Sequence, residues 1–147
     1  YTRECLALPC ARSMDSGDVL RTLKGVASDR GAPIYIRSDN GPEFIGKAMK
    51  DWQEDGGAKM RYCKPGSPWQ NGVVESFHDK LRDEFLQMEI FVTVAEARVL
   101  LDEWRVQYNE FRPHSSLDDL TPAEFAALPC GADSASLHQP HKGLQTC

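Results

Sequence analysis

The stretch Tyr35-Ile36-Arg37-Ser38-Asp39-Asn40-Gly41 decides how the rest of this chain is interpreted. Apolar and polar side chains alternate through residues 34–37, which predicts a short strand. Asn40-Gly41 is a turn signal, so the strand delivers Asp39 at its carboxyl end. A carboxylate in that position is exposed enough to meet Mg²⁺, a hard cation that prefers oxygen ligands. Aspartate is also common in such turns for conformational reasons alone, and this alternative stays open.

A second acid, Glu75, lies in Gln70-Asn71-Gly72-Val73-Val74-Glu75-Ser76, early in a long amphipathic segment. That segment predicts a helix that runs to about Met88. A strand-end aspartate that faces a helix glutamate can hold divalent metal ions, and two such ions can drive in-line phosphoryl transfer. The alternative is that Glu75 is a first-turn acid favoured by the helix macrodipole.

The remaining pattern predicts an α/β fold with the order strand, helix, strand, helix, strand, helix, helix. Two capping boxes, Thr93 with Glu96 and Thr121 with Glu124, mark the starts of the last helices. The other expected elements are a strand over 2–8, a helix over 16–30 capped by Gly31, a helix after Pro42 that stops at Gly56-Gly57, and a strand over 58–62.

Composition limits the classes of protein that fit. The chain has 147 residues, room for one domain with a core. Its net charge of −5 argues against an autonomous nucleic-acid-binding domain, which usually carries a basic surface. No apolar run approaches the ~20 residues of a membrane span, so no membrane partner is expected. The five scattered cysteines have no zinc-ligand spacing, which favours free thiols and a cytoplasmic location.

Three stretches carry a resemblance to a known family: Ser38-Asp39-Asn40-Gly41-Pro42-Glu43-Phe44, Gln70-Asn71-Gly72-Val73-Val74-Glu75-Ser76-Phe77 and Tyr108-Asn109-Glu110-Phe111-Arg112-Pro113-His114-Ser115-Ser116-Leu117. With Thr121-Pro122-Ala123-Glu124-Phe125 behind them, they resemble the integrase catalytic core of bacterial insertion-sequence transposases. That family is related to retroviral integrases and uses a three-acid (DDE) site. The resemblance covers residues 1–128, which we expect to form a partial integrase catalytic core with C-terminal helices. Residues 129–147 are small and polar, which predicts a disordered tail.

The resemblance implies a ribonuclease-H-like α/β fold. Members of the family carry their first catalytic aspartate on the first strand, upstream of a second strand. This chain begins with Tyr1 in a segment that resembles the third strand, and it has no initiator methionine. We therefore expect an N-terminally truncated core that lacks two strands and one of the three catalytic acids.

The resemblance also implies a function. The intact protein would cut and join DNA strands at the ends of a mobile element and at a target, using Mg²⁺ or Mn²⁺ held in part by Asp39 and Glu75, and it would act as a homo-oligomer. One alternative is a catalytically inactive transposase remnant with at most an interaction role. A metal-dependent ribonuclease on the same architecture is a weaker alternative, because the Arg112-Pro113-His114 and Thr121-Pro122 signatures are those of transposases.

Arg82 is the first of four candidate DNA-binding residues. It lies seven residues after Glu75, so two helical turns return it to nearly the same face, offset by ~20°. The family often has a basic residue there that contacts DNA near the cleaved end. The alternative on spacing alone is a solvated arginine that pairs with Asp79 or His78.

Three further candidates precede the helix of Glu75. Gln70 and Asn71 resemble the mobile loop in front of the catalytic glutamate, although Asn71 is also a suitable helix cap. Lys64 belongs to a small basic cluster with Lys59 and Arg61. This cluster either follows DNA phosphates or is the solvated face of an edge strand.

Three more acids bear on the local structure. Glu43 is four residues beyond Asp39 and is either a spare metal ligand or, more simply, a helix-entry acid. Asp118-Asp119 stands where family members commonly have Gly-Tyr, and this departure leaves the conformation of that loop open.

Overall fold

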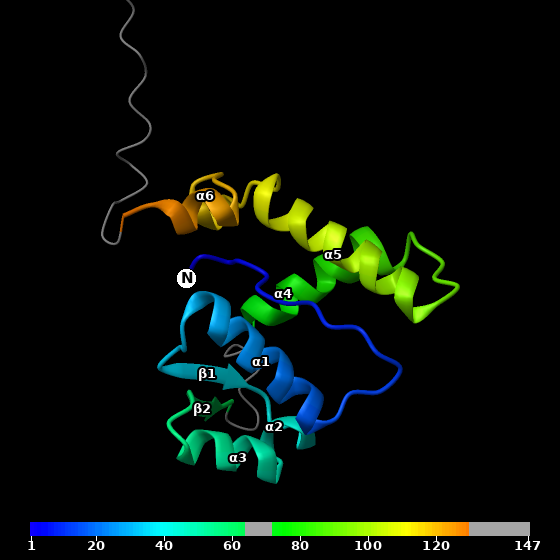
Figure 1. The fold of residues 1–147 in the computed structure, drawn as a ribbon. Helices are drawn as coiled ribbons and strands as arrows, with labels where there is room; N and C mark the ends of the chain where they lie inside the picture. The colour runs from blue at the N-terminus through cyan, green and yellow to red at the C-terminus, as the bar shows by residue number, and fades with distance from the viewer. Residues whose placement is uncertain (64–71, 130–147) are drawn as a thin grey trace, which may run out of the picture. The chain divides into compact units, whose positions relative to one another are not determined.

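The computed structural model describes residues 1–63 and 72–129, which fold as two compact units (Figure 1). The larger unit is Ala7–Leu101, and the smaller consists of Tyr1–Leu6 with the described part of Asp102–Cys147. The described residues form a mixed α/β structure with few strands and several helices. None of the described helices is both long and apolar enough to span a membrane. The predicted tail lies, from residue 130 on, outside the described residues.

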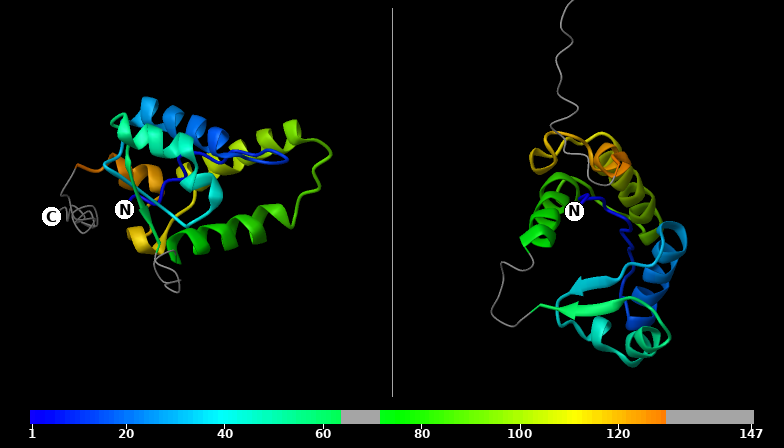
Figure 2. Two further views of the ribbon diagram at one scale, coloured as in Figure 1. Left: turned by 90° about the horizontal axis from the view of Figure 1, so that it is seen from below. Right: turned by 90° about the vertical axis from the view of Figure 1, so that its left-hand side faces the viewer.

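The larger unit is built on two parallel strands, β1 (Tyr35–Ser38) and β2 (Lys59–Tyr62). Tyr35 lies opposite Lys59, and the pairing continues in register to the end of both strands. Parallel strands need a crossover connection, and here the chain between them supplies two helices that return it to the same end of the sheet (Figure 2). Both predicted strands are therefore confirmed.

Helix α1 (Ser16–Arg30) has the bounds that its sequence predicts. Asp15 caps its first turn: the backbone N–H of Asp18 donates to Asp15 Oδ1 at 2.8 Å, and the backbone N–H of Asp15 donates to Asp18 Oδ2 at 3.1 Å. The helix ends at Gly31, whose φ of 86° is the kind of backbone conformation that glycine adopts without strain.

The single helix expected after Pro42 is instead two helices, α2 (Pro42–Ile45) and α3 (Lys47–Glu54). They are separated by Gly46, whose ψ of 160° is extended rather than helical. Both helices lie against α1. A Cβ at Gly46 would lie 3.0 Å from the Cβ of Ser16, so the residue between the two helices is in tight contact with the start of α1. Periodicity could not reveal this contact, because it joins distant parts of the sequence.

A second close approach ends α3. The backbone N–H of Gly57 donates to the carbonyl oxygen of Trp52 at 2.9 Å. A Cβ at Gly57 would lie 2.5 Å from Cε2 and 2.5 Å from the carbonyl oxygen of Trp52. Met49 and Ala58, on either side of this turn, are buried in the core of the larger unit. The turn therefore packs only because residue 57 has no side chain.

Helix α4 (Gly72–Leu81) carries Glu75 and continues into η2 (Arg82–Leu86), a short π-helix. The predicted helix to Met88 is therefore confirmed in position, but its last turn is wider than an α-helix. The backbone N–H of Gln87 donates to the carbonyl oxygen of Arg82 at 2.9 Å. Phe85 is buried in this turn, with its ring centroid 5.5 Å from that of Phe91. Sequence periodicity does not distinguish a π turn from an α turn.

Helix α5 (Val94–Glu110) begins at the predicted capping box. The backbone N–H of Glu96 donates to Thr93 Oγ1 at 3.1 Å, and the backbone N–H of Thr93 donates to Glu96 Oε2 at 3.3 Å. Its apolar stripe is buried or half-buried as expected, at Val94, Ala97, Leu101, Trp104 and Tyr108.

The segment 2–8 is not a strand, so that prediction is wrong. Its backbone pairs instead with one side chain of the smaller unit, Asn109. The backbone N–H of Cys5 donates to Asn109 Oδ1 at 2.9 Å, and Asn109 Nδ2 donates to the carbonyl oxygen of Cys5 at 3.0 Å. An alternating pattern forms a strand only where a partner strand is available, and here an amide side chain takes that place. Burial raises the pKa of the Cys5 thiol to about 11.

The smaller unit closes with η3 (Ser115–Leu117) and α6 (Pro122–Ala127), the latter begun by the predicted box of Thr121 and Glu124. Between them, Asp118 and Asp119 have φ of 54° and 61°, in the left-handed region. The resembled family commonly has glycine at the first of these positions, and glycine takes this conformation freely. Asp118-Asp119, which stands where the family commonly has Gly-Tyr, thus forms a left-handed turn.

The contact between Gly57 and Trp52 predicts that Gly57→Ala lowers the free energy of unfolding by about 1–3 kcal/mol, because the added methyl group has no space. Gly25→Ala, in α1, is the matched control. A Cβ at Gly25 meets nothing within 4 Å, so that change should raise stability by about 0.5–1 kcal/mol. Urea denaturation followed by circular dichroism measures both. Equal effects for the two variants would contradict the packing of Trp52 on Gly57.

Asn109→Ala should lower the free energy of unfolding by about 2–3 kcal/mol, because it leaves the buried N–H and C=O groups of Cys5 without their partner. Gln107→Ala, at an exposed position of the same helix, should change it by less than about 0.5 kcal/mol. Thermal denaturation of the two variants tests the difference. If Asn109→Ala were as stable as its control, the docking of the N-terminal segment on this side chain would be wrong.

Candidate functional site

Asp39 directly follows β1 and is exposed. Its Oδ1 accepts a hydrogen bond from the backbone N–H of Gly41 at 3.2 Å, which is the turn role expected of an aspartate here. The preceding Ser38 is buried, and its Oγ donates to the carbonyl oxygen of Asp39 at 2.9 Å. A carboxylate has about four lone-pair sites, so one hydrogen bond leaves others for a ligand. The turn role and the ligand role are therefore compatible.

Asn40 fixes the position of this turn, a role that the sequence analysis missed. Its Nδ2 donates to the carbonyl oxygen of Cys63 at 3.0 Å, which ties the end of β1 to the end of β2. The Tyr62 hydroxyl donates to the carbonyl oxygen of Phe44 at 2.9 Å and ties β2 to α2. Asn40 has no local signal beyond that of a turn residue, and its partner becomes apparent only once the strands are paired.

Glu75 lies in the first turn of α4 and is exposed. It belongs to the same compact unit as Asp39. The right-hand view of Figure 2 shows the beginning of α4 on the side toward which β1 and β2 point. The two acids thus come from elements whose relevant ends lie on one side of the sheet. That their carboxylates face each other remains a prediction.

Glu43 is in the first turn of α2, as expected of a helix-entry acid. Its carboxylate lies over Gly41, where a Cβ would meet Glu43 Oε1 at 2.6 Å. This brings a further carboxylate to the turn that holds Asp39.

Asp39 and Glu75 suit a hard divalent cation because both offer exposed oxygen ligands. Within residues 1–63 and 72–129, no three His, Cys, Asp or Glu side chains gather closely enough to bind a metal ion together. Asp39 and Glu75 are the two acids in the described part of the chain that the resemblance assigns to a metal site.

Arg82 pairs with acids of its own helix. Its Nη2 lies 2.8 Å from Asp79 Oδ1, and its Nε lies 3.2 Å from Asp83 Oδ1. The hydrogen bonds to Asp83 and then to Asp79 raise the pKa of the Arg82 guanidinium. The alternative of an arginine paired with Asp79 is what the structure shows. All three side chains are more than half exposed, so a DNA phosphate has only weak, solvated pairs to replace.

The other three candidate DNA-binding residues, Lys64, Gln70 and Asn71, lie outside the described residues. Two members of the basic cluster, Lys59 and Arg61, are in β2 and exposed. The guanidinium carbon of Arg61 lies 3.7 Å from the centroid of the Tyr35 ring. This arginine is therefore held against the neighbouring strand.

Comparison with protein families gives two matches, both to models described as an integrase core domain. One covers residues 1–68 and the other residues 56–122. Together they account for most of the chain, including both candidate acids.

A relative from a mobile element supports the same grouping. The chain is 40% identical over 127 residues to the insertion element IS476 uncharacterized 39.2 kDa protein of Xanthomonas euvesicatoria. The matched region is 86% of this chain but 37% of that protein. The chain thus spans little more than a third of this relative's length.

Solved structures identify the fold. A chain of the simian T-cell lymphotropic virus intasome, in complex with the PP2A regulatory subunit B56 gamma, matches with a TM-score of 0.67 and 16% identity over 84% of this chain and 44% of its own. The HTLV-2 integrase catalytic core domain in complex with magnesium (dimeric form) matches with a TM-score of 0.56 and 18% identity, over 80% of this chain and 72% of its own. The predicted class is therefore confirmed at the level of an integrase-core, ribonuclease-H-like fold.

The position of the two acids predicts a shared cation. Asp39→Asn and Glu75→Gln should each weaken binding of Mn²⁺ to the chain about tenfold or more, since each removes a charged oxygen ligand. The double variant should lose less Mn²⁺-binding free energy than the two single variants together, because residues that bind one ion are not independent. Titration calorimetry measures all three, with Asp51→Asn on the exposed face of α3 as the control. Strictly additive effects would place the two acids at separate sites.

Proposed function

The chain belongs to the integrase core domain family, and we propose that it is part of a transposase that cuts and joins DNA strands by metal-dependent phosphoryl transfer. The observation that carries this proposal is the placement of Asp39 immediately after β1, in one compact unit with Glu75 in the first turn of α4. In a parallel pair, carboxyl ends of strands share an edge, and ligands of α/β folds bind at that edge. The signatures around both acids are those that resemble insertion-sequence transposases.

Asp39 and Glu75 are the proposed catalytic residues and would hold Mg²⁺ or Mn²⁺. Bound there, such ions polarise a phosphoryl oxygen and generate a strong oxygen nucleophile at neutral pH. The similar HTLV-2 core was solved in complex with magnesium, which supports this choice of cation. The protein's own contribution is positional: Gly41 and Ser38 hold the turn of Asp39, and Asn40 fixes that turn to β2.

DNA is the proposed partner, both as element ends and as target. Arg82, Lys64, Gln70 and Asn71 are the proposed contacts. Arg82 is exposed, and a phosphate would take the place of Asp79 and Asp83. A chain with a net charge of −5 relies on such local contacts, and on other parts of the larger protein, for affinity. We also propose that the intact protein acts as a homo-oligomer, as the dimeric form of the HTLV-2 core suggests.

One observation favours a second candidate function. The residues that the structure describes contain no group of three potential metal ligands, whereas the DDE site uses three acids. A catalytically inactive remnant, with at most an interaction role, would need no third carboxylate. The two candidates differ in whether an added acid restores activity.

Under the first proposal, residues 1–147 alone should not join strands detectably, on DNA bearing the ends of the related insertion element, with Mg²⁺ or Mn²⁺. Fusion to the preceding part of the 40%-identical relative should supply the third acid and restore joining. In that fusion, Asp39→Asn or Glu75→Gln should lower the rate about a thousandfold or more, since losing several kcal/mol of transition-state stabilisation removes a factor of ten per ~1.4 kcal/mol.

Asp51→Asn in the same fusion protein is the control and should leave the rate unchanged, because Asp51 is an exposed residue of α3 and has no proposed role in the site. A folded fusion protein that binds the element ends but joins no strands would favour the inactive remnant. Strand joining by residues 1–147 alone would contradict the view that Asp39 and Glu75 are an insufficient set of metal ligands.

A further inference from the structure

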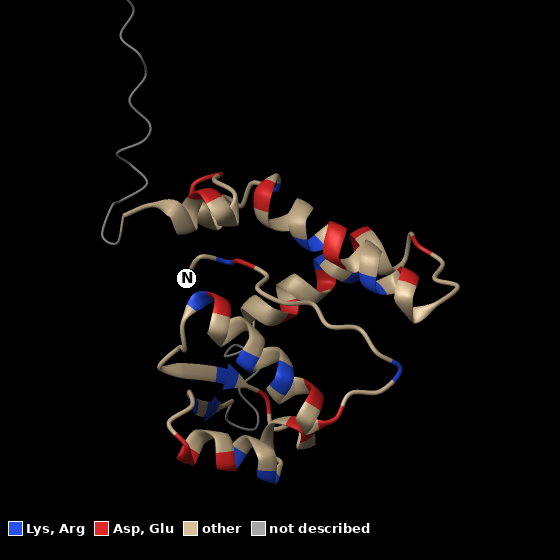
Figure 3. Ribbon diagram, in the orientation of Figure 1, with Lys and Arg blue, Asp and Glu red and all other residues tan. Residues whose placement is uncertain are grey.

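Glu43 is a half-buried acid whose carboxylate lies over the turn that holds Asp39. A Cβ at Gly41 would lie 2.6 Å from Glu43 Oε1 and 2.8 Å from Glu43 Oε2. The same glycine donates its backbone N–H to Asp39 Oδ1 at 3.2 Å. Two carboxylates therefore approach one residue, and Figure 3 shows acidic residues where the chain leaves β1 and enters α2.

The backbone conformation of Gly41 does not require glycine. Its φ of −59° and ψ of 144° are values that residues with a side chain adopt readily, above all before a proline such as Pro42. What the missing Cβ provides is space for the Glu43 carboxylate. The atoms that a Cβ would meet are the end of a flexible side chain, so alanine at position 41 would displace that carboxylate and leave the backbone in place.

The carboxylate of Glu43 does not cap its helix. Glu96 of α5 and Glu124 of α6 each accept a hydrogen bond from the backbone N–H of the residue that caps the helix, at 3.3 Å and 2.8 Å. Helix α2 is a single turn of four residues, and no side-chain hydrogen bond caps it at Gly41. Such a short helix has few aligned peptide dipoles, so a helix-entry role alone explains little of this arrangement.

Hydrogen bonds on both sides hold the backbone of Glu43 beside the end of β1. The backbone N–H of Phe44 donates to the carbonyl oxygen of Gly41 at 3.0 Å, and the Tyr62 hydroxyl donates to the carbonyl oxygen of Phe44 at 2.9 Å. Two carboxylates held at one turn repel each other, whereas a cation bound there attracts both. The arrangement therefore favours a cation at the turn of Asp39.

We propose that Glu43 is a positioning residue of the metal site at Asp39, where it accepts hydrogen bonds from water molecules that are bound to the ion. This inference rests on the proposed function, since the ion is the one assigned to Asp39 and Glu75. Mg²⁺ keeps several waters when one or two carboxylates bind it directly. Within the residues that the structure describes, no three potential ligands gather, which agrees with a contact through water rather than a third direct ligand.

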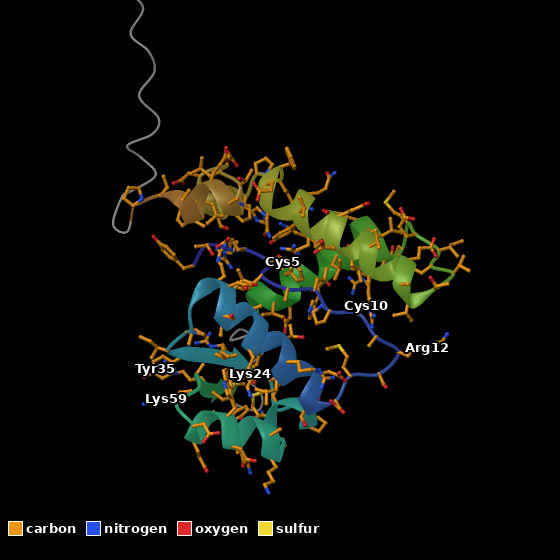
Figure 4. All side chains as sticks on the ribbon, in the orientation of Figure 1. Cys5, Cys10, Arg12, Lys24, Tyr35 and Lys59 are labelled. Carbon is orange, nitrogen blue, oxygen red and sulfur yellow. The ribbon has the colours of Figure 1, made fainter. Side chains whose placement is uncertain are left out.

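The test is a calorimetric titration of residues 1–147 with Mn²⁺. Glu43→Gln should weaken Mn²⁺ binding about tenfold or more, as is typical for groups that bond to the ligands of a metal ion. Glu54→Gln is the matched control and should leave the affinity unchanged. Glu54 ends α3, which returns the chain to the beginning of the strand pair, where Figure 4 shows Tyr35 and Lys59.

Gly41→Ala is a second variant that moves the Glu43 carboxylate without removing it. It keeps the backbone N–H that bonds to Asp39, so it should weaken Mn²⁺ binding only through Glu43. Adding Glu43→Gln to Gly41→Ala should therefore weaken binding little further, because both changes act on one interaction. Additive effects of the two changes would contradict the proposal.

Failure of this inference is distinct from failure of the proposed function. If Asp39→Asn weakens Mn²⁺ binding but Glu43→Gln does not, Glu43 has no part in the metal site and the proposed function stands. A helix-entry role alone gives that result, together with a lower melting temperature of Glu43→Gln in EDTA. If the chain binds no Mn²⁺, or if Asp39→Asn leaves the affinity unchanged, both proposals are wrong.

Discussion

The parallel pairing of β1 with β2 is the constraint on which the larger unit depends. A parallel pair requires a crossover, which here contains α2 and α3. Two glycines allow close approach within it, Gly46 to Ser16 and Gly57 to Trp52. The pairing brings the ends of both strands together, where Asn40 bonds to the carbonyl of Cys63. Asp39 therefore owes its position to contacts made on both sides of the crossover.

Local rules predicted the elements whose ends are determined by neighbouring residues. The bounds of α1 follow from Asp15 and Gly31, and the starts of α5 and α6 follow from reciprocal hydrogen bonds three residues apart. The strand predicted over 2–8 is absent because a strand needs a partner strand. The backbone of Cys5 instead pairs with the side chain of Asn109, 104 residues away. The break at Gly46 was not predicted either, and the tight contact of Gly46 with Ser16 joins it to another helix, distant in the sequence.

In the candidate site, too, the features set by neighbouring residues were predicted and those set by distant residues were not. Asp39 at a strand end and Glu75 in a first helical turn followed from short patterns, and both occupy those positions. The hydrogen bond of Asn40 across the sheet had no local signal. For Arg82 the spacing allowed two states, and a pattern cannot decide between a phosphate and Asp79, because both lie within reach of one flexible side chain. What the sequence could not supply was the identity of partners from outside the local turn.

Charges of both signs lie close to the candidate site. Exposed carboxylates repel a phosphate backbone, so a site that offers Asp39 and Glu75 to a cation also works against DNA until that cation is bound. Arg37, two residues before Asp39, is also exposed and has the opposite sign. Local fields, rather than the net charge of −5, govern what approaches a given surface. An acidic chain can therefore present a basic side chain such as Arg37 immediately beside an acidic one such as Asp39.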